Sequence, residues 1–306
     1  MSVRGLLNVT DLSVDELALV LELSQREPAS LGRPLTTSTG LSLGAALIFE
    51  KPSNRTRHSM EMAVVQLGGH PVYTRGEEVG FDTREPVEDI GRILSGYHGI
   101  VAARVFSHSV VERLRASCSV PVVNMLSDAS HPLQGLADAL TMVNEFGDLA
   151  GRTVAYVGDY NNVARSLGEV CVMSGAHYRL ACPDGYCASD AELARLSSLG
   201  SGSVAQSSDP VATVRGAHAV HTDTWVSMGQ EAEKAERLGI FGAYTVTESL
   251  MAQASSDAIF MHCLPAYRGY EVEASVIDGA ASRVIQQGHN RLHSARGAMA
   301  FLLGVK

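Results

Sequence analysis

The sequence has little positive charge, because 24 Lys and Arg residues stand against 33 Asp and Glu residues and give a formal net charge of −9. Such a chain offers no basic face for nucleic acid, so any site for an anion must be local. It also has no apolar stretch long enough to cross a bilayer and no signal-like apolar run near its start. We therefore expect no nucleic-acid partner and no membrane partner.

Cysteine is scarce and irregularly placed. The five cysteines are an odd number and none is in CxxC spacing, which argues against a disulfide framework and against a structural zinc site. A reducing cytosol fits this usage best, so we expect a cytoplasmic protein. The positions are Cys118, Cys171, Cys182, Cys187 and Cys263.

Short apolar segments alternate with amphipathic helical segments along all 306 residues, a pattern typical of parallel sheets covered on both faces. The length exceeds the usual size of a single core, so we predict two doubly wound α/β domains. We place them at 1–147 and 148–289, with a C-terminal helix over 290–306 completing the first. Strands are expected at 43–49, 70–73, 99–103, 121–124, 153–157, 177–181, 203–206, 218–222 and 258–261.

The segment Ser53-Asn54-Arg55-Thr56-Arg57 lies where the first of these strands passes into a helix. Apolar residues recur with helical spacing from Met60 onward, which makes Ser53 the expected N-cap. Free N–H groups at a helix start favour an anion, and Arg side chains match phosphate oxygens bidentately. The segment therefore predicts a phosphate cradle, and the alternative is a capped surface helix with two solvated arginines.

Polar residues follow two further strands of the first half, where ligands of open parallel sheets bind. Arg104 comes directly after the strand at 99–103. His131 and Gln134 flank Pro132, which suits the first position of a helix. Both side chains can donate hydrogen bonds to one carbonyl group, although His131 could also serve only as a helix cap.

The second half repeats this arrangement after its own strands. Asn162 follows a glycine turn without GxGxxG spacing, so a dinucleotide site is weakly supported, whereas an amide there could hold a carboxylate. Asp223 could pair with an ammonium group. His262 and Cys263 are adjacent on an extended segment and point in opposite directions, so we expect no Cys-His dyad between them.

Taken in order, these motifs resemble those of the aspartate/ornithine carbamoyltransferases, and in the second half those of the ornithine-specific members. The resemblance covers the chain from its first helix to its last. The motifs that carry it are Ser53-Asn54-Arg55-Thr56-Arg57, Arg104, His131-Pro132-Leu133-Gln134, Asp223 with Ser227-Met228-Gly229, His262-Cys263-Leu264-Pro265 and Asn290-Arg291-Leu292-His293.

The resemblance implies transfer of a carbamoyl group from carbamoyl phosphate to the δ-amine of L-ornithine, in a cleft between the two domains and without metal or cofactor. The expected catalytic residues are Arg104, His131, Cys263 and Arg291. Carbamoyl phosphate would be bound by Ser53, Asn54, Arg55, Thr56, Arg57, Arg104, His131, Gln134 and Arg291. Ornithine would be bound by Asn162, Asp223, Ser227, Met228, Cys263 and Leu264.

The resemblance also implies a homotrimer in which a neighbouring subunit completes the phosphate site, with residues 75–86 as the candidate reaching loop. Asn54 departs from the family, which usually has Thr there, and this bears on donor affinity. Another acceptor, putrescine or an acylated ornithine, stays open, and so does a non-catalytic protein that binds carbamoyl phosphate. The direction of the reaction, toward or away from arginine, is also open.

Overall fold

The computed structural model describes residues 5–226 and 231–306, and these form two compact units. The first unit holds residues up to Ala137 together with His289–Lys306, and the second is Asp138–Gly288. Each contains a five-stranded sheet in which all strands are parallel, so the predicted α/β class is confirmed. The chain passes between the units inside two helices, α6 (Pro132–Phe146) and α13 (Val284–Leu302).

The first unit has the strand order β1-β5-β4-β2-β3. Besides parts of α6 and α13, it consists of β1 (Gly5–Leu6), η1 (Val9–Asp11), α1 (Val14–Gln25), η2 (Pro28–Leu31), β2 (Gly44–Phe49), α2 (Asn54–Gln66), β3 (His70–Arg75), α3 (Gly76–Val79), α4 (Val87–Tyr97), β4 (His98–Arg104), α5 (His108–Ser117) and β5 (Val122–Leu126).

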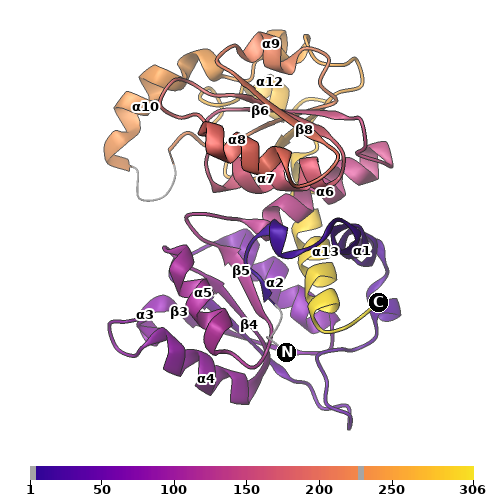
Figure 1. Ribbon diagram of the computed structural model, residues 1–306, viewed down its shortest axis with the longest axis vertical. Coiled ribbons are helices and arrows are strands. Elements are labelled where there is room, and N and C mark those ends of the chain that lie inside the picture. The colour runs from indigo at the N-terminus through magenta and orange to yellow at the C-terminus, as the bar shows by residue number, and fades with distance from the viewer. Residues whose placement is uncertain (1–4, 227–230) are drawn as a thin grey trace. The chain divides into compact units, whose positions relative to one another are not determined.

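The connections of this sheet run in two directions from its middle. The chain moves outward from β2 to β3 and then returns past β2 to β4 and β5, so right-handed crossovers place α2 on one face and α4 and α5 on the other. Figure 1 shows this arrangement. The carboxyl ends of β2 and β4 are therefore the switch point of the sheet, where ligands of such folds bind.

The second unit has the order β10-β9-β6-β7-β8. Besides parts of α6 and α13, it consists of β6 (Thr153–Val157), α7 (Asn162–Met173), β7 (His177–Ala181), α8 (Asp190–Ser197), β8 (Ser203–Ser207), α9 (Pro210–Val214), β9 (Ala219–Thr222), η3 (Glu231–Glu233), α10 (Lys234–Phe241), η4 (Gly242–Tyr244), α11 (Glu248–Met251), β10 (Ile259–His262) and α12 (Ala274–Ile277).

This sheet has its own switch point, because the chain leaves β6 toward β7 and β8 and later returns to β9 on the other side of β6. In Figure 1, α7 and α8 lie on one side of the sheet and α9 and α12 on the other. Trp225, Phe241 and Phe260 belong to the apolar core of this unit. The carboxyl ends of β6 and β9 are thus where a ligand is expected.

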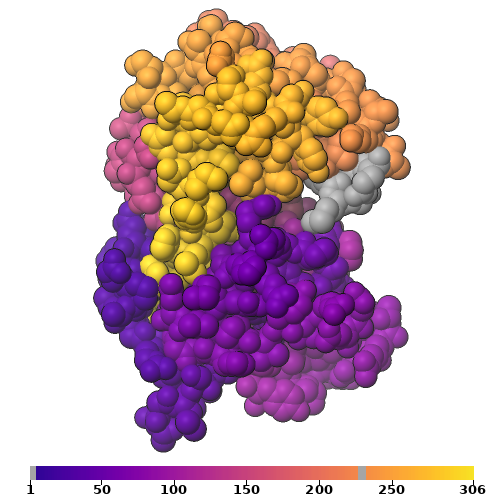
Figure 2. All heavy atoms as spheres, turned by 180° about the vertical axis from the view of Figure 1, so that it is seen from behind, coloured from indigo at the N-terminus to yellow at the C-terminus, as the bar shows by residue number. Residues whose placement is uncertain are grey.

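All nine predicted strands are present within two residues of their expected ends, and the short β1 was not predicted. The final helix begins at Val284, six residues before the predicted start at 290. It ends beside the first helical segment, where Arg26 Nη1 donates to the Lys306 carbonyl oxygen at 3.0 Å. Figure 2 shows the yellow C-terminal residues next to the indigo N-terminal ones. Within the described ranges, no helix is both long and apolar enough to cross a membrane.

Candidate active site

The switch point of the first unit carries the predicted cradle. Ser53 is the N-cap of α2, as expected, and its Oγ accepts from the Thr56 N–H at 3.4 Å. Arg104 ends β4 beside Phe49, the last residue of β2. A register shift against β5 pairs Ala103 with Asn124 but Arg104 with Leu126, so the extra residue of this bulge lies in β5. The cradle, which follows β2, and Arg104 therefore lie at the carboxyl ends of two neighbouring strands.

Arg291 joins three further predicted residues in the same unit. Its Nη1 donates to Gln134 Oε1 at 2.5 Å and to His131 Nε2 at 3.1 Å, and its Nη2 donates to Thr56 Oγ1 at 3.3 Å. All four residues are buried. Three helices, α2, α6 and α13, are thus connected by one planar guanidinium, whose rigid fork holds the other side chains in fixed relative positions.

Burial and the surrounding arginines together keep the His131 ring neutral. Burial lowers the pKa of His131 well below its usual value, and the nearby Arg291, Arg104 and Arg55 lower it further. Because the Arg291 guanidinium can only donate, His131 Nε2 accepts and the proton of the neutral ring is assigned to Nδ1. A neutral His131 leaves the arginines to supply the positive charge that an anion requires.

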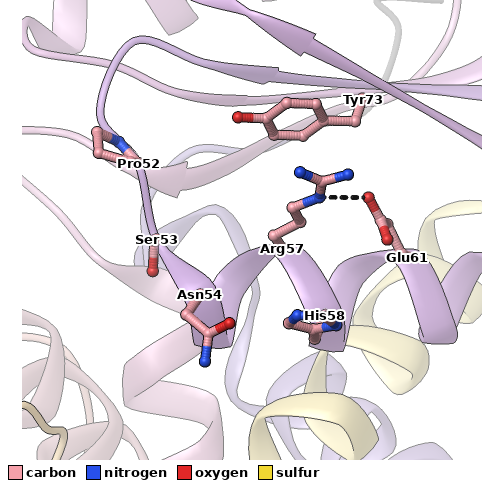
Figure 3. A pocket seen from close by; sticks show the side chains of 7 residues that line it. All are labelled: Pro52, Ser53, Asn54, Arg57, His58, Glu61 and Tyr73. Carbon is pink, nitrogen blue, oxygen red and sulfur yellow. Dashed lines mark hydrogen bonds and ion pairs between the residues drawn. The ribbon is translucent and has the colours of Figure 1, made fainter.

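Arg57 lines a pocket of about 470 Å³ together with Ser53 and Asn54 (Figure 3). Its Nε donates to Glu61 Oε1 at 2.9 Å, and its Cζ lies 3.9 Å from the centre of the Tyr73 ring. The guanidinium is held by these two partners. The sequence-based role of Arg57 in binding the phosphate stays a prediction.

In the second unit, Asp223 follows β9 and is buried. Its Oδ1 accepts from Cys263 Sγ at 3.1 Å and from the Thr224 N–H at 2.8 Å, while its Oδ2 accepts from Asn161 Nδ2 at 3.0 Å. The structure therefore brings together two predicted residues, Asp223 and Cys263, at the switch point. Asn162 begins α7 close by, since its neighbour Asn161 bonds to Asp223.

Asn161 is a residue that sequence reasoning missed. Its Oδ1 accepts from the N–H groups of Val163 and Ala164, so Asn161 rather than Asn162 caps α7. The capping preference of Asn was the available signal, but two consecutive asparagines left it undecided.

His262 binds partners other than Cys263, and the expected absence of a dyad between these two residues stays a prediction. Its Nε2 donates to the buried Glu271 Oε1 at 3.1 Å, and its Nδ1 accepts from the Leu264 N–H at 2.9 Å. The donor atoms of Asp223, His262 and Cys263 lie within 4.8 Å of one another, close enough for a metal ion. Both ring nitrogens of His262 are already engaged, however, so this geometry does not favour a metal ligand there.

Two predicted ornithine ligands, Ser227 and Met228, lie outside the described residues. Leu264 directly follows Cys263 and has a φ of +60°, which is unusual for a residue with a branched side chain. Glu271, which holds His262, carried no signal in the sequence, because it is nine residues away and in no recognised motif.

Comparison with known proteins also divides the chain in two, although residues 289–302, which belong to the first unit, fall in the second match. Residues 4–144 match the family described as aspartate/ornithine carbamoyltransferase, carbamoyl-P binding domain, and residues 150–302 match its Asp/Orn binding domain. The chain is 45% identical over 307 aligned positions to an ornithine carbamoyltransferase of Hyperthermus butylicus, covering 98% of this chain and 97% of that one.

Two solved structures extend the comparison. An ornithine carbamoyltransferase from Pyrococcus furiosus is 39% identical with a TM-score of 0.92, covering 100% of this chain and 99% of that chain. An N-acetyl-L-ornithine transcarbamylase complexed with PALAO is 28% identical with a TM-score of 0.85, covering 96% and 98%. The two family matches and the identity over almost the whole chain lead to one conclusion: the chain belongs to the aspartate/ornithine carbamoyltransferase family.

Proposed function

We propose that the protein transfers the carbamoyl group of carbamoyl phosphate to the δ-amine of L-ornithine, giving L-citrulline and phosphate. The observation that carries this proposal is the Arg291 cluster. It holds His131, Gln134 and Thr56 in the unit that matches a carbamoyl-P binding domain.

The first unit supplies the groups that the donor requires. Departure of phosphate needs cations and N–H donors at the leaving group, and Arg55, Arg104 and the start of α2 provide them, with Ser53, Asn54 and Arg57 beside them. Attack on the carbamoyl carbon develops negative charge on the carbonyl oxygen, which Thr56, His131, Gln134 and Arg291 would stabilise.

The second unit supplies the groups that the acceptor requires. The Asp223 carboxylate suits the α-ammonium of ornithine, and Asn162 with Ser227 and Met228 would hold the remainder of the amino-acid group. Cys263 and Leu264 would lie near the δ-amine. That amine must lose a proton before it attacks, which partial desolvation favours, and a phosphate oxygen of the donor can accept this proton.

A second candidate function differs from the first only in its acceptor. One solved relative is an N-acetyl-L-ornithine transcarbamylase, so an acylated amine is a real alternative. The buried Asp223 favours a free α-ammonium over an acylated one, because a neutral amide leaves the carboxylate without a counter-charge.

An acceptor panel decides between these functions. The purified protein is incubated with carbamoyl phosphate and with ornithine, N-acetylornithine, putrescine or aspartate in turn, and both phosphate and the carbamoylated product are measured. We expect turnover with ornithine. Turnover with another amine and none with ornithine would refute the proposed acceptor, and binding of carbamoyl phosphate without transfer to any amine would indicate a non-catalytic protein.

We also propose a cytoplasmic homotrimer. All five cysteines are free thiols, as in proteins of a reducing compartment. Residues 75–86 would reach the neighbouring subunit's phosphate site. Light scattering after size-exclusion chromatography should give three times the chain mass of 32.5 kDa, and a monomer with full activity would contradict the shared site.

A further inference from the structure

Three loops of the first unit adjoin most of the predicted donor-binding residues. The loop after β2 leads to Ser53, the loop after β4 begins at Arg104, and the loop after β5 leads to His131. The ladder between β2 and β4 ends with the pair Phe49 and Arg104. Beyond that pair the loops diverge, so other bonds must fix their relative positions.

Glu50 provides one such attachment with its own side chain. The last ladder bond runs from the Glu50 N–H to the Arg104 carbonyl oxygen at 2.9 Å. If the parallel ladder continued, the Phe106 N–H would donate next to the backbone carbonyl of residue 50. It donates instead to the carboxylate, Glu50 Oε2, at 2.8 Å. The longer reach of a side chain lets the two loops separate and still remain connected.

Phe106 also connects the third loop. Its carbonyl oxygen accepts from the Asp128 N–H at 3.2 Å, and its ring lies 4.5 Å from Lys51 Nζ. Burial lowers the pKa of Lys51, Arg104 lowers it further, and Asp128 and Glu50 act in the opposite direction. The Lys51 ammonium thus lies among charged groups from all three loops.

We propose that Glu50, Lys51, Phe106 and Asp128 form a loop clasp that positions Arg104 against the phosphate cradle, and that Glu50 is its central positioning residue. The inference rests on the proposed function, because it assigns the clasp to the donor half of that reaction. Glu50 acts through its bond to the Phe106 N–H and does not itself contact the donor.

The test compares Glu50→Ala, Glu50→Asp and Glu50→Gln. Gln keeps an acceptor oxygen at the same reach, so KM for carbamoyl phosphate should stay within about twofold of the unsubstituted protein. Ala removes the acceptor and Asp shortens its reach. Either should raise this KM by about threefold to tenfold, the effect of one hydrogen bond, while KM for ornithine stays unchanged.

Glu273→Ala is a matched control. Glu273 Oε2 also accepts a backbone N–H from a segment 25 residues away, that of Glu248 at 2.9 Å, but it lies in the second unit and in no predicted site. Its loss should leave KM for carbamoyl phosphate unchanged. The melting temperature is recorded for every variant, with and without inorganic phosphate.

An equal KM in Glu50→Ala and the unsubstituted protein would overturn the proposal. The proposal would also be overturned if Glu50→Ala raised KM for carbamoyl phosphate and KM for ornithine equally and Glu50→Gln did the same. That result would show that Glu50 only stabilises the structure. If no acceptor is carbamoylated, the proposed function fails. The clasp is then judged from phosphate binding alone, where Glu50→Ala should reduce the phosphate-induced rise in melting temperature and Glu50→Gln should keep it.

Discussion

The guanidinium carbon of Arg57 lies 3.9 Å from the centre of the Tyr73 ring, so its charge is held against β3 while Glu61 binds its Nε. We expect Arg57→Ala to abolish turnover without unfolding the protein, because it removes a cation beside Ser53 and Asn54. Tyr73→Ala should weaken donor binding by about twofold to fivefold, the size of an exposed cation–π contact. Tyr73→Phe keeps the ring and serves as the control. Near-normal activity of Arg57→Ala at saturating carbamoyl phosphate would show that its role is structural.

Arg291→Ala should lower kcat/KM by about 100-fold or more, since one substitution releases His131, Gln134 and Thr56 together. Arg291→Lys should restore little, because an ammonium cannot reproduce the planar fork. Ser294→Ala, one turn further along α13, removes bonds to the Leu133 carbonyl at 3.3 Å and to the Arg291 backbone carbonyl at 3.5 Å but leaves the Arg291 guanidinium in place, so it is the matched control. Steady-state kinetics with each substrate varied provides the measurement, and a Lys variant as active as the parent would contradict the role of the fork.

For Asp223→Ala we expect ornithine binding to fail while carbamoyl phosphate binding survives, because Asp223 belongs to the second unit. Calorimetric titration with carbamoyl phosphate and KM for ornithine separate the two effects. Thr224→Ala keeps the backbone N–H that Asp223 accepts and controls for local disturbance. Equal loss of both substrates would contradict the division of labour between the units.

His131 should make the protein less stable in mild acid. Its native pKa is lowered, so below the unfolded value of about 6.5 the unfolded chain takes up a proton that the native state does not. The free energy of unfolding should therefore fall by about 1.4 kcal/mol for each pH unit below this value, until the native pKa is reached.

Urea unfolding at a series of pH values between 5 and 8 measures this slope. For His131→Gln, the fall in the free energy of unfolding per pH unit should be smaller by the contribution of one proton, about 1.4 kcal/mol, since Gln does not titrate. An identical slope in this variant would assign the acid sensitivity to other groups, of which His98 and His293 also have lowered pKa values.

Ser13→Ala should reduce the free energy of unfolding by about 1 kcal/mol, the usual value of an N-cap, and leave both KM values unchanged. Ser13 Oγ accepts from the Glu16 N–H at 3.3 Å, and Glu16 Oε2 accepts from the Ser13 N–H at 2.9 Å. Ser30→Ala, at an exposed position of η2, is a control. A loss in Ser13→Ala no greater than in the control would show that the capping box contributes little.

Local rules were sufficient for most of the fold. The cap at Ser53 and the apolar strands depend on neighbouring residues, so the sequence alone predicts them. The early start of α13 was not predicted, because no capping signal marks Val284. The two-residue strand β1 is too short to show a periodicity.

Contacts between residues far apart in the sequence were harder to predict. Motif order identified Arg291, His131 and Gln134, but only the fold shows that one guanidinium binds both of the others. Sequence reasoning assigned no role to Glu50. Its bond to the Phe106 N–H spans 56 residues, and no local pattern encodes such a separation.

The division of the chain has a consequence for its synthesis. The second unit is one continuous segment, whereas the first needs residues from both ends of the chain. A ribosome adds residues from the N-terminus onward, so Asp223 and Cys263 are both in place before Arg291 exists. A messenger RNA truncated shortly before the codon for residue 291 would therefore encode every predicted ornithine-binding residue. Its product would lack Arg291, so the carbamoyl phosphate site of the first unit could not be completed.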